Sequence, residues 1–329
     1  MQRWLIGVLV VALVAAAAIV TVNVVGVPFR RDDRASIAVR WAALGDSYSS
    51  GLGEIDRPQG CARDVRASYV GQAVELLRSK GYKVALRFVA CSGATLDHLL
   101  VAPTSESLAQ LESVDATVNL VTLTFGGDDV GFGSVVSSCL ASHFAGRLSA
   151  VLGVDTRISE CAVDADNPTN RGGGEDGWKG IEDELLATLR TLLGRMSPTG
   201  QVFVLSYPLV FADPAGWPTV SCFGFTADNA HAFNLGVVRM GEAMRNAIAR
   251  ANDDPVRVRF VDWREQTSER NVWADHGLCG KESPWVHGVR AFEPGGLSAS
   301  LANSFHPTVA GYAHAADLLS KAIEATTNK

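Results

Sequence analysis

A serine and a histidine far apart in the sequence each occupy a position that suits them for chemistry. Ser47 follows a mostly apolar run and stands among small, hydroxyl-bearing residues in the segment 43–51. His306 lies in a Ser-Phe-His-Pro segment just before a helical pattern near the carboxyl terminus. A serine hydroxyl becomes a good nucleophile when a neutral imidazole can accept its proton. The pair could therefore supply the nucleophile and the base of an acyl-transfer site.

Two further segments follow apolar runs and contain glycine. The segment 91–95 includes Gly93, and the segment 126–132 includes Gly127 and Asp128. Glycine lets the backbone approach a substrate because no Cβ stands in the way. Backbone N–H groups in such turns are also available to an anion. Together with a nucleophile and a base, these are the components of an acyl-transfer site.

The fold must bring these segments together. Apolar runs alternate with helical patterns, and the runs are apolar along most of their length, which indicates a parallel sheet covered on both faces. We expect an α/β fold, a flavodoxin-like three-layer sandwich with a mostly parallel sheet. Its strands are predicted at 37–44, 84–90, 118–125, 202–206 and 256–261, and its helices at 69–80, 106–111, 178–196, 228–251 and 307–325.

Turns that follow parallel strands share one edge of the sheet when the crossovers are right-handed. Ser47, Gly93 and Asp128 each follow one of the first three strands, and His306 precedes the last helix, which is expected to begin with Pro307. We therefore expect one site at the carboxyl edge. Taken singly, Ser47 could instead be a helix cap and His306 an ordinary hydrogen-bonded residue.

Long segments between these elements are predicted to be loops. They are 214–225, 265–303 and a polar, Gly-rich insertion at 139–174 with a short helix near its start. Trp263, Trp273 and Trp285 could line an acyl site, touch lipid or pack in the core. The remaining histidines are expected to be structural, with His314 on a face of the last helix; they are His98, His143, His231, His276, His287 and His314.

The amino terminus differs from the rest of the chain. Trp4–Val27 is almost wholly apolar, long enough to cross a bilayer, and lacks a convincing small-residue cleavage site. Residues 1–29 are therefore predicted to be an uncleaved signal anchor or, alternatively, a cleaved signal peptide. Residues 30–36 form a linker, and 37–329 form one domain. Either way the domain is exported, anchored to the cell envelope or secreted.

Charge and cysteine content narrow the class of protein. The formal net charge is −6 and no cluster of Lys and Arg stands out, which argues against a nucleic-acid partner. Six cysteines in an exported chain indicate disulfides, with fifteen pairings possible. None lies in a Cys-x-x-Cys pair, and no metal or organic cofactor is implied.

The four segments together resemble the SGNH (GDSL) hydrolase family, particularly its actinobacterial secreted lipases, esterases and phospholipases. The resemblance lies in Gly-Asp-Ser-Tyr-Ser-Ser-Gly at 45–51, Cys-Ser-Gly-Ala-Thr at 91–95, Gly-Gly-Asp-Asp-Val-Gly-Phe at 126–132 and His-Pro-Thr-Val-Ala-Gly-Tyr at 306–312. The segments appear in the order of the family, and they span nearly all of the chain after the amino-terminal segment.

The resemblance implies roles for individual residues. Ser47 would be the nucleophile and His306 the general base. The oxyanion hole would comprise the backbone N–H groups of Ser47 and Gly93 and the side chain of residue 128. Separately from the resemblance, Asp46 is expected to brace the turn and not to take part in the chemistry. The secreted relatives pair their cysteines consecutively, which implies the disulfides Cys61–Cys91, Cys139–Cys161 and Cys222–Cys279.

Residue 128 departs from the pattern of the family, which has Asn there. An amide donates a hydrogen bond to an oxyanion, whereas the ionised carboxylate of Asp128 would repel it. A protonated Asp128 could donate instead, and the adjacent Asp129 would favour one proton on the pair. Alternatively, Asp128 turns away and caps a backbone turn.

Residue 303 also departs, since the family usually has an acid there to orient the histidine. Asn303 carries no charge, so the main-chain carbonyl of Asn303 or Ser304 is expected to orient His306 in a Ser-His dyad. Asp262, at the end of the last strand, is a less favoured substitute. On this interpretation, Asn303→Ala would leave folding and most activity intact.

The sequence thus predicts a serine ester hydrolase that cleaves ester or lipid substrates through an acyl-enzyme on Ser47. One alternative is an acyltransferase of the cell envelope that uses the same site, because an alcohol can also accept the acyl group. Another is a binding module that kept the fold after losing efficient catalysis, an interpretation that rests on Asp128 and Asn303.

Overall fold

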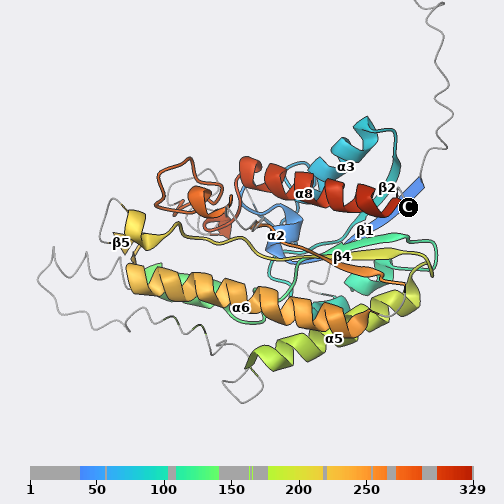
Figure 1. Cartoon of the computed structure of the whole chain (residues 1–329), viewed down its shortest axis with the longest axis horizontal. Helices are drawn as coiled ribbons and strands as arrows, with labels where there is room; N and C mark the ends of the chain where they lie inside the picture. Colours follow the sequence, from blue (N-terminus) through green and yellow to red (C-terminus); the bar gives the residue numbers. More distant parts are fainter. Residues whose placement is uncertain are drawn as a thin grey trace, which may run out of the picture. The chain divides into compact units, whose positions relative to one another are not determined.

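Parallel strands form the centre of the computed structural model, in the order β2-β1-β3-β4-β7 (Figure 1). These strands are β1 (Ala38–Ala43), β2 (Lys83–Phe88), β3 (Leu120–Leu123), β4 (Gln201–Leu205) and β7 (Val258–Val261). Each pairs with its neighbour in parallel. The structure describes residues 38–55, 58–102, 109–140, 163, 165, 177–217, 221–252, 255–264, 272–290 and 302–327.

Helices cover both faces of this sheet, as Figure 1 shows. α3 (Tyr69–Ser79) and α8 (Val309–Thr327) pack together on one side, and α5 (Gly177–Arg195) and α6 (Ala227–Ala251) pack together on the other. Side chains cap their starts: the Ser68 hydroxyl accepts from Gly71 N–H, and the Thr226 hydroxyl accepts from Asn229 N–H. The predicted three-layer α/β/α architecture with a parallel sheet is confirmed.

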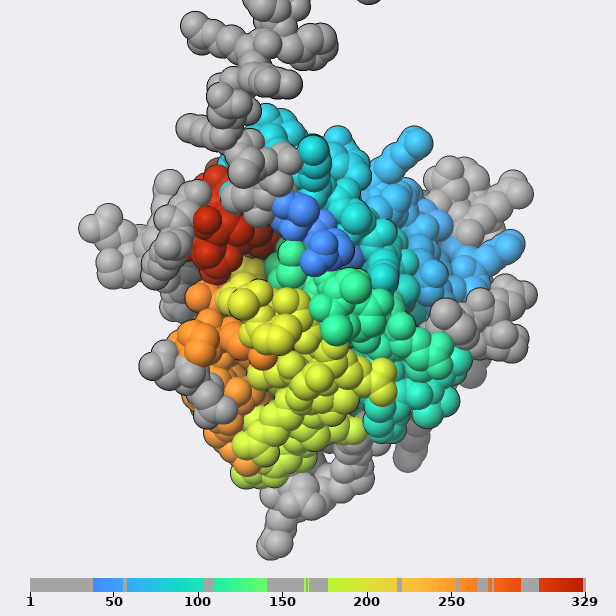
Figure 2. All heavy atoms as spheres, turned by 90° about the vertical axis from the view of Figure 1, so that its right-hand side faces the viewer, coloured from blue at the N-terminus to red at the C-terminus, as the bar shows by residue number. Residues whose placement is uncertain are grey.

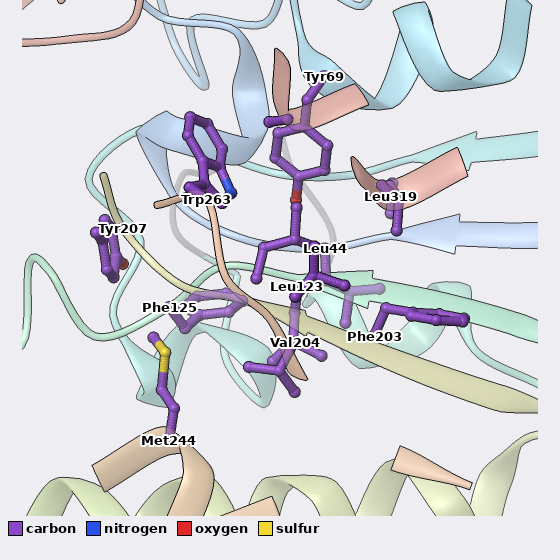
Figure 3. Close-up of a cluster of buried hydrophobic side chains, with 14 of the residues drawn as sticks. Leu44, Tyr69, Leu123, Phe125, Phe203, Val204, Tyr207, Met244, Trp263 and Leu319 are labelled. Carbon is purple, nitrogen blue, oxygen red and sulfur yellow. The ribbon is translucent and has the colours of Figure 1, made fainter. Parts of the chain in front are cut away.

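Apolar side chains fill both interfaces between the sheet and the helices. All four residues of β3 are buried, as are the last four of β4. In Figure 3, Leu44, Leu123 and Val204 lie between Leu319 of α8 and Met244 of α6. This burial on both faces is the reason that the central strands read as continuous apolar runs in the sequence.

Shorter elements lie at the edges of the sheet. They are α2 (Ser47–Ser50), the 3₁₀ helices η1 (Leu96–Leu99), η2 (Gln110–Ser113), η3 (Pro214–Gly216) and η4 (Ala274–His276), and a hairpin of β5 (Ser221–Cys222) and β6 (Phe225–Thr226). Figure 2 views the edge at which β1, in blue, begins, with α8 in red beside it. α2 follows the opposite end of β1.

Several boundaries differ from the sequence prediction. α8 begins at Val309, where the Thr308 hydroxyl accepts from Gly311 N–H, so Pro307 precedes the helix instead of starting it. The expected loop 214–225 contains η3 and most of the β5–β6 hairpin, and the loop 265–303 contains η4. Residues 132–140 are helical, so this helix starts before the predicted insertion 139–174, which lies almost wholly outside the described residues. Of the predicted helix 106–111, only the end is described, within η2.

The predicted signal anchor or signal peptide (1–29) and the linker (30–36) lie outside the described residues. Residues 37–329 group into one compact unit by their internal contacts. Among the helices that the structure describes, none has both the length and the apolar composition of a membrane span.

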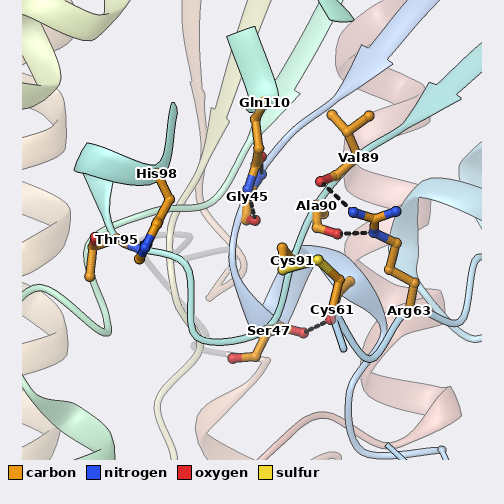
Figure 4. The surroundings of a disulfide bond; sticks show 11 residues. Gly45, Ser47, Cys61, Arg63, Val89, Ala90, Cys91, Thr95, His98 and Gln110 are labelled. Carbon is orange, nitrogen blue, oxygen red and sulfur yellow. Dashed lines mark hydrogen bonds between the residues drawn. A yellow bond between two sulfur atoms is a disulfide. The ribbon is translucent and has the colours of Figure 1, made fainter. Parts of the chain in front are cut away.

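Two of the disulfides implied by the resemblance are present. Cys61–Cys91 joins the loop before α3 to the end of β2 (Figure 4), and Cys222–Cys279 joins the β5–β6 hairpin to the segment after η4. Cys139 is also disulfide-bonded, and its predicted partner Cys161 lies outside the described residues.

We predict that the double substitution of Cys61→Ser and Cys91→Ser lowers the free energy of unfolding by about 3–4 kcal/mol. The bond closes a loop with a sequence separation of 30, and in the chain-entropy account its loss frees the unfolded chain by about this amount. Urea denaturation followed by circular dichroism measures the change. A free energy equal to that of the oxidised parent protein would contradict the prediction.

Candidate active site

The turn after β1 places Ser47 at the carboxyl edge of the sheet. Gly45 has φ +137°, and a Cβ there would lie 2.9 Å from the Thr124 carbonyl oxygen, so no other residue fits without strain. The Asp46 carboxylate then accepts from Tyr48 N–H at 3.0 Å and caps α2. Ser47 is the first residue of this short helix. The Gly-Asp-Ser sequence thus has a structural reason at each position.

A buried glutamine, which the sequence analysis did not single out, holds the same turn. The Gln110 side chain accepts from the Gly45 N–H at 2.8 Å and donates to the Gly45 carbonyl at 3.0 Å (Figure 4). Gln110 lies in η2, and nothing in the pattern of nearby residues marks it. Only the fold places it against Gly45.

Ser47 and His306 are brought together by the fold. The Ser47 Oγ and the His306 Nε2 are 2.8 Å apart. The opposite ring nitrogen, Nδ1, lies 2.9 Å from the Ser304 carbonyl oxygen. Of the two predicted carbonyl partners, Asn303 and Ser304, the carbonyl of Ser304 is the one that lies against the ring.

The other predicted orienting groups point elsewhere. The Asn303 side chain accepts from Gly53 N–H at 3.0 Å and donates to the Ile55 carbonyl at 2.6 Å. Asp262 accepts hydrogen bonds from the Arg264 main chain and guanidinium. Asp262 is therefore engaged in an ion pair, and Asn303 acts as a brace between two loops.

Burial sets the protonation state of the histidine. It lowers the pKa of His306 to about 4, although the hydrogen bond to the Ser304 carbonyl opposes the shift. The imidazole is consequently neutral from weakly acidic pH upward. A neutral ring with its Nε2 beside the Ser47 hydroxyl can accept the proton of that hydroxyl.

The three residues predicted to form the oxyanion hole lie together. Ser47, Gly93 and Asp128 line one cavity. Gly93 has φ +78°, and the space where a Cβ would stand is open. Within the described part of the chain, the N–H groups of Ser47 and Gly93 make no hydrogen bond. The Gly127 N–H, in contrast, donates to the Tyr207 hydroxyl at 2.8 Å.

The adjacent acids Asp128 and Asp129 have different surroundings. The buried Asp129 carboxylate accepts from Leu96 N–H with both oxygens, at 3.2 and 3.1 Å. Asp128 lines the cavity, and burial, with the charge of Asp129, raises its pKa to about 6. A cavity-lining carboxyl group that keeps its proton below pH 6 can donate a hydrogen bond there.

Asp46 braces the turn, as the sequence analysis expected. Besides capping α2, its carboxylate accepts from the Tyr207 hydroxyl. Burial, and then the charge of Asp128, raise the pKa of Asp46 well above its ordinary value. Tyr207, whose role the sequence analysis did not foresee, thereby connects the turn after β1 to the turn after β3.

The cavity beside Ser47 and His306 has a volume of about 280 Å³. Its walls are largely apolar and come from the helix at 132–140, the segment after β4, α6 and the histidine loop; they include Phe132, Val136, Val210, Phe233, Val237 and Phe305. A larger hollow of about 860 Å³ lies beside α3 and α8, and none of the predicted catalytic residues lines it.

The tryptophans and the other histidines stand apart from this cavity. Trp263 and Trp273 are fully buried in the core, and Trp285 stacks on His276, so the possibility that they line an acyl site is wrong. Partners hold most of the other described histidines: Thr95 for His98, Ser283 for His276, Glu54 for His287 and the Trp263 carbonyl for His314, which is on α8. His231 is exposed on α6, and His143 lies outside the described residues.

Known proteins resemble this chain over all the segments that form the site. The sequence profile of the GDSL-like lipase/acylhydrolase family matches residues 43–314, which include all four segments that carry the resemblance. Lipase 1 of Streptomyces coelicolor is 26% identical over 317 residues, or 94% of this chain and 95% of that protein. A lipase of Streptomyces rimosus is 29% identical over 283 residues, or 83% of this chain and 82% of that protein.

Solved structures show the same fold. The extracellular lipase of Streptomyces rimosus superposes with a TM-score of 0.57 and 23% identity, over 86% of this chain and 99% of that chain. The phospholipase A1 of Streptomyces albidoflavus gives a TM-score of 0.57 and 22% identity over the same shares. These likenesses extend over nearly the full length of both structures.

The structure changes the expectation for Asn303→Ala. Asn303 is only 1% exposed and its side chain makes two hydrogen bonds. We therefore predict that the substitution lowers the free energy of unfolding by about 2–4 kcal/mol. Because the Ser304 carbonyl still orients His306, the rate at which a fluorophosphonate modifies Ser47 should stay within about fivefold of the parent. Denaturation and labelling kinetics measure the two quantities.

A matched control is Asn252→Ala. The Asn252 side chain also bridges backbone groups, of Arg257 and Val258, at the opposite end of α6 from the hairpin. We expect a comparable loss of stability and an unchanged labelling rate. A hundredfold slower labelling of folded Asn303→Ala, not seen in this control, would show that Asn303 takes part in the chemistry.

Proposed function

Because the chain belongs to the GDSL-like lipase/acylhydrolase family, it is a carboxylic ester hydrolase, and we propose that Ser47 and His306 carry its reaction. The observation that supports this assignment is the 2.8 Å contact between the Ser47 Oγ and the His306 Nε2. The contact lies in a cavity with apolar walls, where an acyl group can be bound.

In the proposed reaction the Ser47 Oγ attacks the ester carbonyl carbon while its proton passes to His306 Nε2. The tetrahedral intermediate places its oxyanion near the Ser47 and Gly93 N–H groups and the Asp128 carboxyl group. When the carbon–oxygen bond to the alcohol breaks, His306 returns the proton to the leaving oxygen. Water, activated by the same imidazole, then releases the acid from the acyl-enzyme.

We assign the acyl chain of the substrate to the apolar cavity. Its volume is about 280 Å³. Its walls are largely apolar, so an acyl chain bound there would be removed from water.

Export of the domain is part of the proposal. Disulfides persist mainly in oxidising compartments, and Cys61–Cys91 and Cys222–Cys279 are both formed. The apolar segment Trp4–Val27 precedes the domain in the sequence and can direct export as a signal anchor or as a signal peptide. We place the ester hydrolase outside the cytoplasm on these two grounds.

Labelling with a fluorophosphonate tests the catalytic assignment. The folded, disulfide-bonded protein should be modified at Ser47, as located by peptide mass spectrometry, and Ser47→Ala should not be modified. Ser137→Ala is the matched control, because Ser137 lines the same cavity without contacting His306. If the folded parent protein is not labelled, the proposal is wrong and a binding module is favoured.

Asp128→Asn tests the third oxyanion donor. With the pKa of His306 lowered to about 4 and that of Asp128 raised to about 6, the imidazole is neutral and the carboxyl group protonated between these values. We expect kcat/KM to be maximal there and to fall above pH 6. Asn donates at every pH, so the variant should lack this fall and exceed the parent about tenfold at pH 7.

The measurement is the pH profile of hydrolysis of a short p-nitrophenyl ester, from pH 4 to 9. At pH 7 about one tenth of a group with a pKa of 6 is protonated, which sets the expected ratio. A parent profile that stays flat through pH 8, or a variant that is slower than the parent at pH 7, would show that the ionised Asp128 serves the reaction.

A further inference from the structure

The histidine of this site is oriented by the main chain, and that orientation depends on one unusual backbone conformation. The His306 Nδ1 meets the carbonyl of Ser304, only two residues earlier. Phe305, between them, folds back with φ +61°. A bulky residue adopts this left-handed conformation at a cost of about 1–3 kcal/mol. Surrounding contacts must therefore hold the loop in this shape.

Hydrogen bonds hold both Phe305 and the residue that follows it. Its N–H donates to the His287 carbonyl at 2.9 Å, and the His287 N–H donates to the His306 carbonyl at 2.8 Å. The carbonyl of Phe305 accepts from the hydroxyl of Tyr48 at 2.7 Å. The first two bonds are between main-chain groups. Tyr48 therefore supplies a side-chain contact to the residue in the left-handed conformation.

Tyr48 is itself firmly placed. It is the residue after Ser47, and its N–H is bound by Asp46. Its ring packs edge-on against Tyr207 at a centroid distance of 5.1 Å, and lies 5.1 Å from the His306 ring. The residue beside the nucleophile thus contacts both the ring of the base and the loop that carries it.

The Tyr48 hydroxyl also stays a donor throughout the working pH range. Burial, and then the charges of Asp46 and Asp128, raise the pKa of Tyr48 well above its ordinary value. The hydroxyl consequently does not ionise at any pH at which the site would act.

We propose that Tyr48 is a positioning residue of this hydrolase, and that it replaces the missing acid indirectly. Its hydroxyl holds the Phe305 carbonyl, keeps Phe305 folded back, and so keeps the Ser304 carbonyl against Nδ1 of His306. The inference rests on the proposed roles of Ser47 and His306.

The test is Tyr48→Phe, which removes one oxygen and keeps the ring that lines the cavity. With a short p-nitrophenyl ester, kcat should fall about 10- to 100-fold, the scale of a misplaced catalytic group, with KM changed less than about threefold. The acid limb of kcat/KM should also move to lower pH. The hydrogen bond to the Ser304 carbonyl favours the imidazolium, so weakening it lowers the pKa of His306.

A matched control is Tyr82→Phe, whose hydroxyl bonds Thr327 away from the site. We expect its kcat and pH profile to equal those of the parent. In a Phe305→Gly background the conformation at residue 305 costs little, so Tyr48→Phe should there lower kcat less than about threefold. This comparison separates positioning of the loop from a general loss of stability.

The outcomes distinguish this inference from the proposed function. If the parent is labelled by the fluorophosphonate and folded Tyr48→Phe keeps the parent kcat and acid limb, the positioning role of Tyr48 is overturned while Ser47 stands. An equal fall of kcat in both backgrounds at residue 305 also overturns it. If the parent itself is not labelled, the assignment of Ser47 and His306 fails first.

Discussion

The 2.8 Å contact between the Ser47 hydroxyl and the His306 ring joins residues that are 259 positions apart. The contact requires the end of β1, which Ser47 follows, to lie beside the start of α8, which His306 precedes. α8 packs against α3 on the face that covers β1, and the Tyr312 hydroxyl of α8 donates to the Leu52 carbonyl just beyond α2 at 2.7 Å. The layered packing of the whole domain thus fixes one short distance.

Burial shifts the pKa values of His306 and Asp128 in opposite directions, and both shifts favour the neutral form of the side chain. It lowers the pKa of His306, because the charged form is the protonated one, and raises the pKa of Asp128, because there the charged form is the ionised one. Both groups are therefore held neutral in the same weakly acidic range. In the proposed reaction, these are the forms in which His306 can act as the base and Asp128 as a hydrogen-bond donor.

A main-chain carbonyl, not a carboxylate, lies against the Nδ1 of His306. A carbonyl attracts an imidazolium less strongly than a full negative charge does, but it is placed by the backbone and needs no buried charge. The conformation of Phe305 then becomes critical, and its ring is packed among Phe211, Phe223 and Phe225. The aromatic cluster and the Tyr48 hydroxyl together hold Phe305 in a backbone conformation that a bulky residue does not favour by itself.

The sequence by itself determined the fold class and the residues at the centre of the site. Buried strands read as apolar runs, and the Gly-Asp-Ser segment at 45–47 marks the turn that presents Ser47, so these features could be predicted from the types and order of the residues. The cysteine pairs Cys61–Cys91 and Cys222–Cys279 followed from the resemblance to relatives.

Only the tertiary structure decided the partners of those residues. It placed the Ser304 carbonyl, and not a group of Asn303, against His306, and it joined two loops through the Asn303 side chain. It also brought Gln110 and Tyr207 to the turn and the Tyr48 hydroxyl to the Phe305 carbonyl. It also showed that Trp263 and Trp273 pack in the core, and that α6 and the helix at 132–140 supply much of the cavity wall. These outcomes depend on contacts between segments distant in sequence, and side-chain type alone carries no record of which distant group it will meet.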